Sequence, residues 1–470
     1  MIKSHAEAQS TQRQREKASA PLRESSGGDE LPNGWATMPV AEVIEDFQPG
    51  FASGEKNVEG GVAHLRMNNI GLDGELVLDL LRTVPEKLAK PRHDLSPGDV
   101  LVCTTNSGAL VGKCAYFDLP GRYAFSNHLT RLRPRRDIVD GRFLRWNLWL
   151  HWKRGLFNDK CKHWVNQSTL PKDALLEDEV VVPPVAEQRR IVAKLETLLG
   201  KVDASQQRLA KIPVLLKRFR QSVLAAACSG RLTADWREQN GVSEEFETTT
   251  VDAIAEYVGS FAYKSPTFLE AGKHQVIRIG NVRPFVLNLS ASPVFIPDDI
   301  AADTERFKLK ADDIVISMTG TKYKRDYGCA GIVRETDGSL FLNQRVARIR
   351  CGKSVLPKFL LFWLQTDLFR DFFFSGETGN VNQGNVGAGG IRNAPIELPP
   401  LPEQQEIVRR VEGLFALADQ LEVRLAKARG QVDALTPSLL ARAFAGKLVL
   451  QNPNDEPAEK LLERIKQQQR

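Results

Sequence analysis

The sequence predicts an α+β protein made of two similar halves, each an α/β globular domain followed by a long helix. The stretch 180–232 occurs again 216 residues later without a gap, so that Pro183 corresponds to Pro399 and Gly230 to Gly446. Framework segments of the preceding domains also recur, at offsets that drift from 212 to 217 residues. A solenoid unit would repeat every ~20 to 50 residues, so this longer period indicates a duplicated domain with its connector.

Composition sets broad limits on the class of protein. The chain has 470 residues and 42% of them are hydrophobic, which is enough to bury ordinary cores. No apolar run has the length of a membrane helix and residues 1–30 are polar, so we expect a cytoplasmic protein with no membrane partner. The six cysteines form no CxxC pair, which argues against a disulfide framework or a zinc ribbon. A net charge of +6 fits a polyanionic partner without establishing one.

The first half contains a polar tail and one domain. Residues 1–30 hold almost no large apolar side chain and are predicted to be disordered, and the first domain is expected over 31–184. Apolar runs bounded by turn residues predict strands at 76–78, 100–102 and 129–132. The aromatic-rich segment 143–152 is predicted to be a helix.

The second half repeats this plan with different loops. A linker is expected at 233–245 and the second domain at 246–400. The loop 104–111 is small and neutral, whereas the corresponding loop 318–327 carries three basic residues and two tyrosines. The two domains therefore share a scaffold and present different surfaces.

Two long helices are predicted over 185–232 and 401–448. Apolar residues alternate there in steps of four and three for about five heptads, the period of a left-handed coiled coil. An interior proline costs a helix about 3 kcal/mol, so we expect kinks at Pro213 and Pro437. If the helices pair antiparallel, the chain acquires an approximate two-fold axis, which suits a partner with two half-sites such as duplex DNA. Residues 449–470 are expected to form a short helical cap.

These motifs resemble those of the specificity (S) subunits of Type I restriction-modification enzymes. The sequence Pro-Pro-x-x-Glu-Gln begins at Pro183 and again at Pro399, and the helices end in Ser229-Gly230-Arg231-Leu232 and Ala445-Gly446-Lys447-Leu448. With Leu31-Pro32-Asn33-Gly34-Trp35 at the entry, the resemblance covers nearly all of 31–465. It implies two target-recognition domains that read a bipartite, asymmetric site on double-stranded DNA. It also implies helices that set the spacing between half-sites, two methylation (M) subunits and restriction (R) subunits.

Within the two helices, the residues expected to fix the spacing or contact partner subunits follow the Glu-Gln pairs and the heptads. They are Glu187, Gln188, Ile191, Leu195, Leu209, Leu216, Glu403, Gln404, Ile407, Leu425 and Leu435.

The chain lacks the usual signatures of catalysis. No Asp/Glu-x-Lys triplet of a metal nuclease, no GxxxxGK[ST] phosphate loop and no Asn-Pro-Pro-aromatic motif of DNA methyltransferases occurs. We therefore expect no catalytic residue, no metal site and no cofactor in this chain, with S-adenosylmethionine, ATP and Mg bound by the partner subunits. The alternatives are a stand-alone or fused restriction or methylation enzyme, and a coiled-coil scaffold that does not bind DNA.

Candidate DNA contacts lie in the two divergent loops and beside one paired strand. A solvated surface loop or basic face is the alternative for each of them, while positive charge with polar and aromatic neighbours suits phosphate contact and base readout. The candidates in the second half are Thr319, Lys322, Tyr323, Lys324, Arg325 and Arg345; those in the first are Thr104, Thr105, Asn106, Ser107, His128, Arg131 and Arg133.

The pairs Asn166-Gln167 and Asn382-Gln383 recur in both halves, which favours bracing of the fold over readout.

Overall fold

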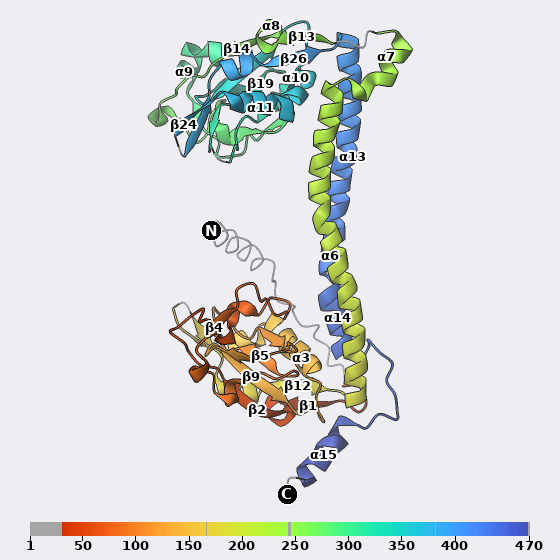
Figure 1. Cartoon of the computed structure of the whole chain (residues 1–470). Coiled ribbons are helices and arrows are strands. Elements are labelled where there is room, and N and C mark those ends of the chain that lie inside the picture. Colours follow the sequence, from red (N-terminus) through yellow and green to blue (C-terminus); the bar gives the residue numbers. More distant parts are fainter. Residues whose placement is uncertain (1–30, 166, 243–245, 323, 381, 469–470) are drawn as a thin grey trace. The chain divides into compact units, whose positions relative to one another are not determined.

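The structure is a computed structural model that describes residues 31–165, 167–242, 246–322, 324–380 and 382–468 (Figure 1). The tail predicted over 1–30 lies outside these residues. The chain divides into two compact units: unit 1 comprises 1–208 with 428–470, and unit 2 comprises 209–427. Each unit therefore contains one globular domain and parts of both long helical regions.

Unit 1 is built on four small sheets. The central one has four antiparallel strands in the order β2-β9-β5-β7, and a second, β4-β3-β8, includes the parallel pair β3 and β8. A pair, β1-β12, and a three-stranded sheet, β10-β11-β6, complete the domain. The strands are β1 (Ala36–Pro39), β2 (Ile44–Pro49), β3 (Val62–Leu65), β4 (Arg82–Val84), β5 (Val100–Cys103), β6 (Thr105–Asn106), β7 (Cys114–Tyr116), β8 (Tyr123–Phe125), β9 (Leu129–Pro134), β10 (Lys162–His163), β11 (Ser168–Thr169) and β12 (Glu179–Val182).

Unit 2 repeats these four sheets strand for strand and adds a two-stranded sheet of β16 (Val282–Arg283) and β17 (Val286–Leu287). Its repeated sheets are β14-β23-β19-β21, β18-β15-β22 with β15 and β22 parallel, β13-β26, and β24-β25-β20. The structure thus confirms the duplication predicted from sequence. The strands are β13 (Glu247–Thr250), β14 (Ala255–Val258), β15 (His274–Ile277), β18 (Phe295–Ile296), β19 (Ile314–Ser317), β20 (Thr319–Gly320), β21 (Ala330–Ile332), β22 (Ser339–Leu342), β23 (Val346–Cys351), β24 (Glu377–Asn380), β25 (Gln383–Val386) and β26 (Pro395–Leu398).

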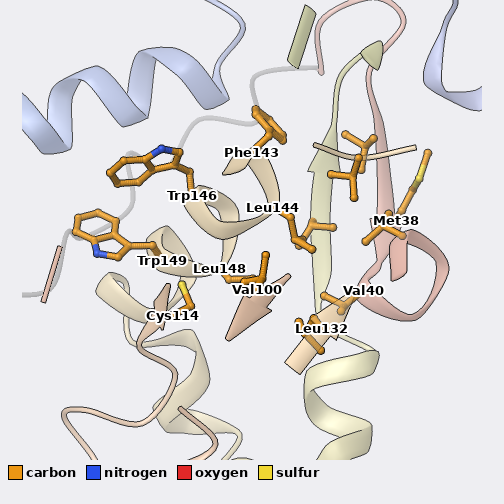
Figure 2. Packing of buried hydrophobic residues seen from close by; sticks show 14 of the residues in the cluster. Met38, Val40, Val100, Cys114, Leu132, Phe143, Leu144, Trp146, Leu148 and Trp149 are labelled. Atoms are coloured by element: carbon orange, nitrogen blue, oxygen red, sulfur yellow. The ribbon is translucent and has the colours of Figure 1, made fainter. Parts of the chain in front are cut away.

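The main core of unit 1 lies between the central sheet and helix α3 (Gly141–Lys153), which confirms the helix predicted at 143–152. Asp140 caps α3 by accepting hydrogen bonds from two backbone N–H groups of its first turn. Figure 2 shows side chains of α3, among them Leu144 and Leu148, in one cluster with Val100 and Leu132 of the sheet. In unit 2 the helices α10 (Pro357–Trp363) and α11 (Asp367–Ser375) contribute aromatic side chains to the corresponding core.

The long helices are α6 (Val185–Cys228) and α13 (Leu401–Asp433), the latter followed by α14 (Leu435–Phe444). Their pairing is antiparallel within each unit. In unit 1, Leu440 of α14 packs in one cluster with Leu195 near the start of α6. In unit 2, Val411 near the start of α13 packs with Val223 near the end of α6, and Arg220 binds Asp419 at 2.6 Å.

Burial along these helices has a period of seven residues, as expected for a coiled coil. Of the residues assigned to the helices by sequence, Leu209 is half-buried and Leu435 is 45% exposed, while the others are buried. The fully buried series are Gln188, Leu195, Val202, Leu216 and Val223 in α6, and Gln404, Val411, Ala418 and Leu425 in α13.

The two prolines have different consequences for the helices. Pro213 lies inside α6, which continues past it as one helix. At Pro437 the second region divides, because a proline has no N–H to bond the carbonyl four residues earlier, and α13 ends at that residue, Asp433.

The Glu-Gln pair of each Pro-Pro-x-x-Glu-Gln motif fastens a helix to its own domain. Gln188 donates to the carbonyls of Ile138 at 2.9 Å and Pro183 at 2.8 Å and accepts from the backbone N–H of Asp140. Gln404 makes the same three kinds of bond in unit 2, to Ser354, Pro399 and Leu356. We call these two arrangements the glutamine clasps; both side chains are fully buried and bind within their own unit.

The neighbouring glutamates have different partners. Glu187 accepts a hydrogen bond from the Trp35 indole at 3.0 Å. Glu403 accepts from Arg237 at 2.5 Å and from the Thr233 hydroxyl at 2.6 Å. Both glutamates are buried and bind within their own unit.

Three further segments complete the comparison with the sequence predictions. The expected linker 233–245 instead contains helix α7 (Ala234–Asn240), which carries Arg237. The strand expected at 76–78 is wrong, because Leu76 makes only an isolated bridge to Ile70. At the C-terminus, α15 (Ala458–Gln468) packs Ala458 and Leu461 into the unit 1 core. Among the helices of the described residues, none is long and apolar enough to cross a membrane.

Candidate nucleic-acid interface

A polar hollow opens on the surface of each unit, at corresponding positions of the repeat. The unit 1 hollow, of about 460 Å³, is lined from three segments that are far apart in sequence, around Lys56, Arg66 and His128. The unit 2 hollow, of about 570 Å³, is lined around Tyr263, Arg278 and Arg345. Arg66 corresponds to Arg278, and His128 to Arg345, in the offsets found by sequence.

The floor of both hollows has the same framework. Arg66 and Arg278 each precede a short 3-10 helix, and their backbone N–H groups donate to Asn69 and Asn281, both at 2.9 Å. These asparagines are buried and use their amide N–H groups to bind loop carbonyls, Asn69 to that of Val77 at 2.7 Å. Each arginine side chain in turn donates to a loop carbonyl. The framework residues are therefore fixed in place before any ligand arrives.

The residues that project from this framework differ between the hollows. Asn127 and His128 line the unit 1 hollow where Gln344 and Arg345 line the unit 2 hollow. Arg345 has a φ of 71°, a left-handed conformation that is uncommon outside glycine, and its carbonyl accepts a hydrogen bond from the Met318 N–H at 2.9 Å. Asn127, Gln344 and Arg345 are exposed and His128 is half-buried, so polar groups of different chemistry face solvent in the two units.

Several buried polar atoms at the hollows have no hydrogen-bond partner among the described residues. They are His64 Nε2, Arg66 Nε and Ser126 Oγ in unit 1 and Asn343 Oδ1 in unit 2. A buried polar group without a hydrogen-bond partner costs free energy. A polar ligand bound in the hollows would supply partners for these atoms.

The electrostatics of the hollows favour an anionic ligand. Burial, together with the positive charge of Arg82, lowers the pKa of Arg66, so two guanidinium groups lie near each other at the unit 1 hollow, which Glu55 also lines. Burial also lowers the pKa of His64, which keeps that imidazole neutral near pH 7. Of the described residues that line the unit 2 hollow, three are arginine and none is acidic.

The predicted reading loop of unit 1 adjoins its hollow. The backbone N–H groups of Thr104 and Thr105 donate to the His128 carbonyl at 3.0 and 3.3 Å. The Thr104 hydroxyl lies 3.1 Å from that of Thr130, while Asn106 accepts from the Ser107 N–H at 2.8 Å and donates to the Cys103 sulfur. Asn106 therefore shapes its own turn, and Ser107 is exposed.

The corresponding loop of unit 2 is an ordered basic turn. Thr321 accepts from the N–H groups of Lys324 and Arg325, and the Asp326 carboxylate accepts from the Thr321 N–H, which lowers the pKa of Asp326. Lys324 and Arg325 are exposed, with Arg325 4.9 Å above the ring of Phe374. Lys322 donates to the Gly379 carbonyl at 3.2 Å.

Thr319 and Tyr323 are the other two candidates in this loop. Thr319 is buried and bonds Asn385 at 2.9 Å, so its hydroxyl braces the fold and is not offered to DNA. Tyr323 lies outside the described residues.

Arg131 and Arg133 form ion pairs within unit 1. Arg131 is 3% exposed and bonds the Asp94 carbonyl at 2.7 Å and the Asp46 carboxylate. Arg133 makes a two-point ion pair with buried Asp99, and this hydrogen bonding raises the pKa of Arg133. The expected phosphate contact by Arg131 is therefore corrected.

The same ion pairs occur in unit 2. Arg348 is 4% exposed and bonds Glu256, and Arg350 makes a two-point ion pair with Asp313 at 2.7 Å to each carboxylate oxygen. The repeat at offset 217 was visible in the sequence and is the signal that marks these arginines as framework.

The paired Asn-Gln segments lie at hairpin ends. Gln167, Asn382 and Gln383 are exposed, which does not fit bracing of the fold, and Asn166 lies outside the described residues.

The fold and these surfaces define a class: a duplicated α/β protein with one polar, partly basic hollow per repeat. A family model described as Type I restriction modification DNA specificity domain matches 49–214 and 243–427, so the chain belongs to that family and is a specificity subunit of the Type I restriction-modification class.

Curated relatives and solved structures agree with this assignment. The Type I restriction enzyme EcoKI specificity subunit of Escherichia coli K12 is 29% identical over 93% of this chain and 96% of its own length. The StySPI specificity subunit of Salmonella potsdam is likewise 29% identical, over 93% and 96%. The HsdS subunit from Thermoanaerobacter tengcongensis has a similar fold, with a TM-score of 0.58 at 17% identity over 90% of this chain and all of that one. A chain from a structure of a type I R-M system gives a TM-score of 0.66 at 18% identity, over 89% and 99%.

Proposed function

We propose that this chain reads a bipartite, asymmetric site on double-stranded DNA, one half-site with each unit. The observation that carries the proposal is the pair of hollows, which share one framework and differ in the residues that project from it. Phosphate contacts position a protein on DNA, while contacts to base edges specify the sequence. Two units that read different half-sites therefore need a shared framework and different lining residues.

The lining residues have the chemistry for base readout. An arginine side chain forms two hydrogen bonds with guanine, and a glutamine or asparagine side chain does so with adenine in the major groove. Gln344 and Arg345 supply these groups in unit 2, and Asn127 and His128 supply an amide and an imidazole in unit 1. Exposed Lys324 and Arg325 suit the phosphates beside the unit 2 half-site.

The chemistry of modification and cleavage is assigned to partners. We infer that the chain is non-catalytic and carries two methylation subunits and, through them, restriction subunits. S-adenosylmethionine, ATP and Mg would be bound by those subunits, and the methylation subunit would flip the target base out of the duplex. The relatives named above as restriction enzyme specificity subunits support this division.

Methylome sequencing of a host that carries this chain with its methylation subunits tests the proposal. We expect one new modified motif with two unlike half-sites separated by unspecified bases. A symmetric motif, or no new motif, would contradict the proposal. Cleavage or methylation of DNA by the purified chain alone would favour the enzyme alternative, and failure of the assembled complex to retain specific DNA would favour a scaffold.

A further inference from the structure

The hairpin of unit 1 formed by β10 and β11 exposes two large apolar side chains at its tip. Trp164 is 70% exposed and Val165 is 99% exposed. They lie in the turn closed by hydrogen bonds between Trp164 and Gln167, at 2.7 Å from the Trp164 N–H and 3.4 Å from the Gln167 N–H. The other tryptophans of unit 1, Trp35, Trp146, Trp149 and Trp152, are buried, so the exposure of these adjacent apolar side chains calls for an apolar contact surface elsewhere.

The base of this hairpin is well anchored. His163 bonds the Ser168 hydroxyl across the strands at 2.8 Å and the Asn158 carbonyl at 3.1 Å. The central strand β11 also pairs with β6, the strand that contains Thr105 and Asn106 of the predicted reading loop. The apolar tip is therefore carried by the same three-stranded sheet as that loop.

The corresponding hairpin of unit 2 carries Asn380 where unit 1 has Trp164, at an offset of 216 residues, while Val165 has the counterpart Val381 in the sequence. Strands β24 and β25 pair over the register Glu377 to Asn380, and the exposed residues at this end include Asn380, Asn382 and Gln383. Its packing onto the domain is tight, since a side chain at Gly384 would meet the Tyr327 hydroxyl at 2.5 Å. The scaffold of the hairpin is thus repeated, whereas the large aromatic side chain at its end is not.

The geometry of the unit 1 hairpin indicates which DNA surface it fits. The major groove of B-DNA, ~12 Å wide, admits a two-stranded ribbon, and the apolar group displayed there is the C5-methyl of thymine. Exposed Lys162 on β10 adds a positive charge beside the tip, which suits the phosphates at the groove edge.

We propose that Trp164 and Val165 contact thymine methyl groups in the major groove of the half-site that unit 1 reads. This inference rests on the proposed function and adds a specificity-determining contact to it. It assigns unit 1 at least one A·T pair that is read through its methyl group, and it makes Trp164, which is Asn380 in unit 2, the residue that distinguishes the two hairpins.

Binding of the chain, assembled with its methylation subunits, to duplexes that carry the modified motif tests this contact. Each thymine is replaced in turn by uracil, which removes only the methyl group. For the wild-type complex we expect a loss of about fourfold in affinity at one or two thymines of one half-site, the effect of one buried methyl. In Val165→Ser and Trp164→Ala complexes that loss should shrink or vanish, while Asn380→Ala, the matched change on the unit 2 hairpin, should retain it.

The outcomes separate this inference from the proposed function. Motif-specific binding that is insensitive to every thymine-to-uracil change, or equally sensitive in wild-type and Val165→Ser complexes, would overturn the thymine contact alone. So would loss of assembly with the methylation subunits in both variants, since the tip would then be a protein contact. A half-site of unit 1 made only of G·C pairs would overturn it as well. A wild-type complex that does not prefer its motif over unrelated DNA would overturn the proposed function itself.

Discussion

Unit 1 and unit 2 have the same scaffold and differ where the scaffold meets solvent. Both contain the same four sheets, a glutamine clasp and the buried Arg–Asp pair of Arg133 with Asp99 or Arg350 with Asp313. Their hollows and hairpin ends carry different side chains. The comparison teaches that polar residues that are both repeated and buried hold the fold, and that the unrepeated exposed ones are candidates for recognition.

The largest predicted effect comes from Glu187 and Glu403, the glutamates that precede the clasp glutamines, because their hydrogen-bond partners differ between the two units. Glu403→Gln should destabilise unit 2 by about 3 kcal/mol, because it leaves Arg237, buried with it, without its counter-charge. Glu187→Gln should cost nothing or stabilise unit 1, because the amide still accepts from Trp35 and no charge remains buried.

Hydrogen exchange resolved by segment measures both changes. Faster exchange of unit 2 amides in Glu403→Gln, with unit 1 unchanged in Glu187→Gln, is the expected pattern. Equal destabilisation by the two substitutions would show that the glutamates have the same role.

The buried arginine of each central sheet should give the next largest effect. Arg131→Gln and Arg348→Gln should each destabilise their unit by about 2 kcal/mol, since each removes the ion pair of a buried guanidinium and a bond to a backbone carbonyl. Neither should change the salt dependence of DNA binding while the unit stays folded. Denaturant unfolding and DNA binding at several salt concentrations distinguish these effects. A lower slope of log affinity against log salt for Arg131→Gln would show that Arg131 contacts a phosphate.

The stability of unit 1 should depend on pH through Glu187. Burial raises the pKa of Glu187 above its ordinary value of 4.5, so this group costs no stability below that pH. As the pH rises through the raised folded-state pKa, the buried group becomes charged and unit 1 loses stability. The stability of Glu187→Gln relative to wild type should therefore increase between pH 4.5 and neutrality. Thermal unfolding across this range measures the difference, and parallel pH profiles would contradict it.

The smallest predicted effect concerns the exposed turn of unit 2. Lys324→Ala should reduce the slope of log affinity against log salt by about one, as expected for a single phosphate contact. Lys324→Arg keeps the charge and serves as the matched control. An unchanged slope in Lys324→Ala would mean that the turn does not contact the backbone of DNA.

The sequence predicted the architecture because its signals are periodic. The 216-residue repeat and the heptads located α6 and α13, and the strands at 100–102 and 129–132 followed from short apolar runs between turn residues. The break before Pro437 and the continuity of α6 at Pro213 could not be separated, because both prolines occupy similar patterns and tertiary packing decides which helix divides.

The candidate site was predicted less well for a different reason. Its hollows are assembled from segments far apart in the chain, such as those of Lys56, Arg66 and His128, and no local pattern links them. Positive charge alone also misplaced Arg131, since a buried arginine that is paired with an aspartate looks like an exposed one in sequence. The exposed tip at Trp164 went unnoticed because its strands are only two residues long.

Exchange of the residues that project into the two hollows tests the central claim most directly. One complex carries Asn127→Gln with His128→Arg, which gives unit 1 the pair found in unit 2, and the other carries Gln344→Asn with Arg345→His. Methylome sequencing of hosts with each complex should show a changed or relaxed half-site in both cases, and a different half-site in each, with the other half and the spacer intact. Changes in the same half-site, or an unaltered motif in both hosts, would contradict the account that each unit reads its own half-site through its own hollow.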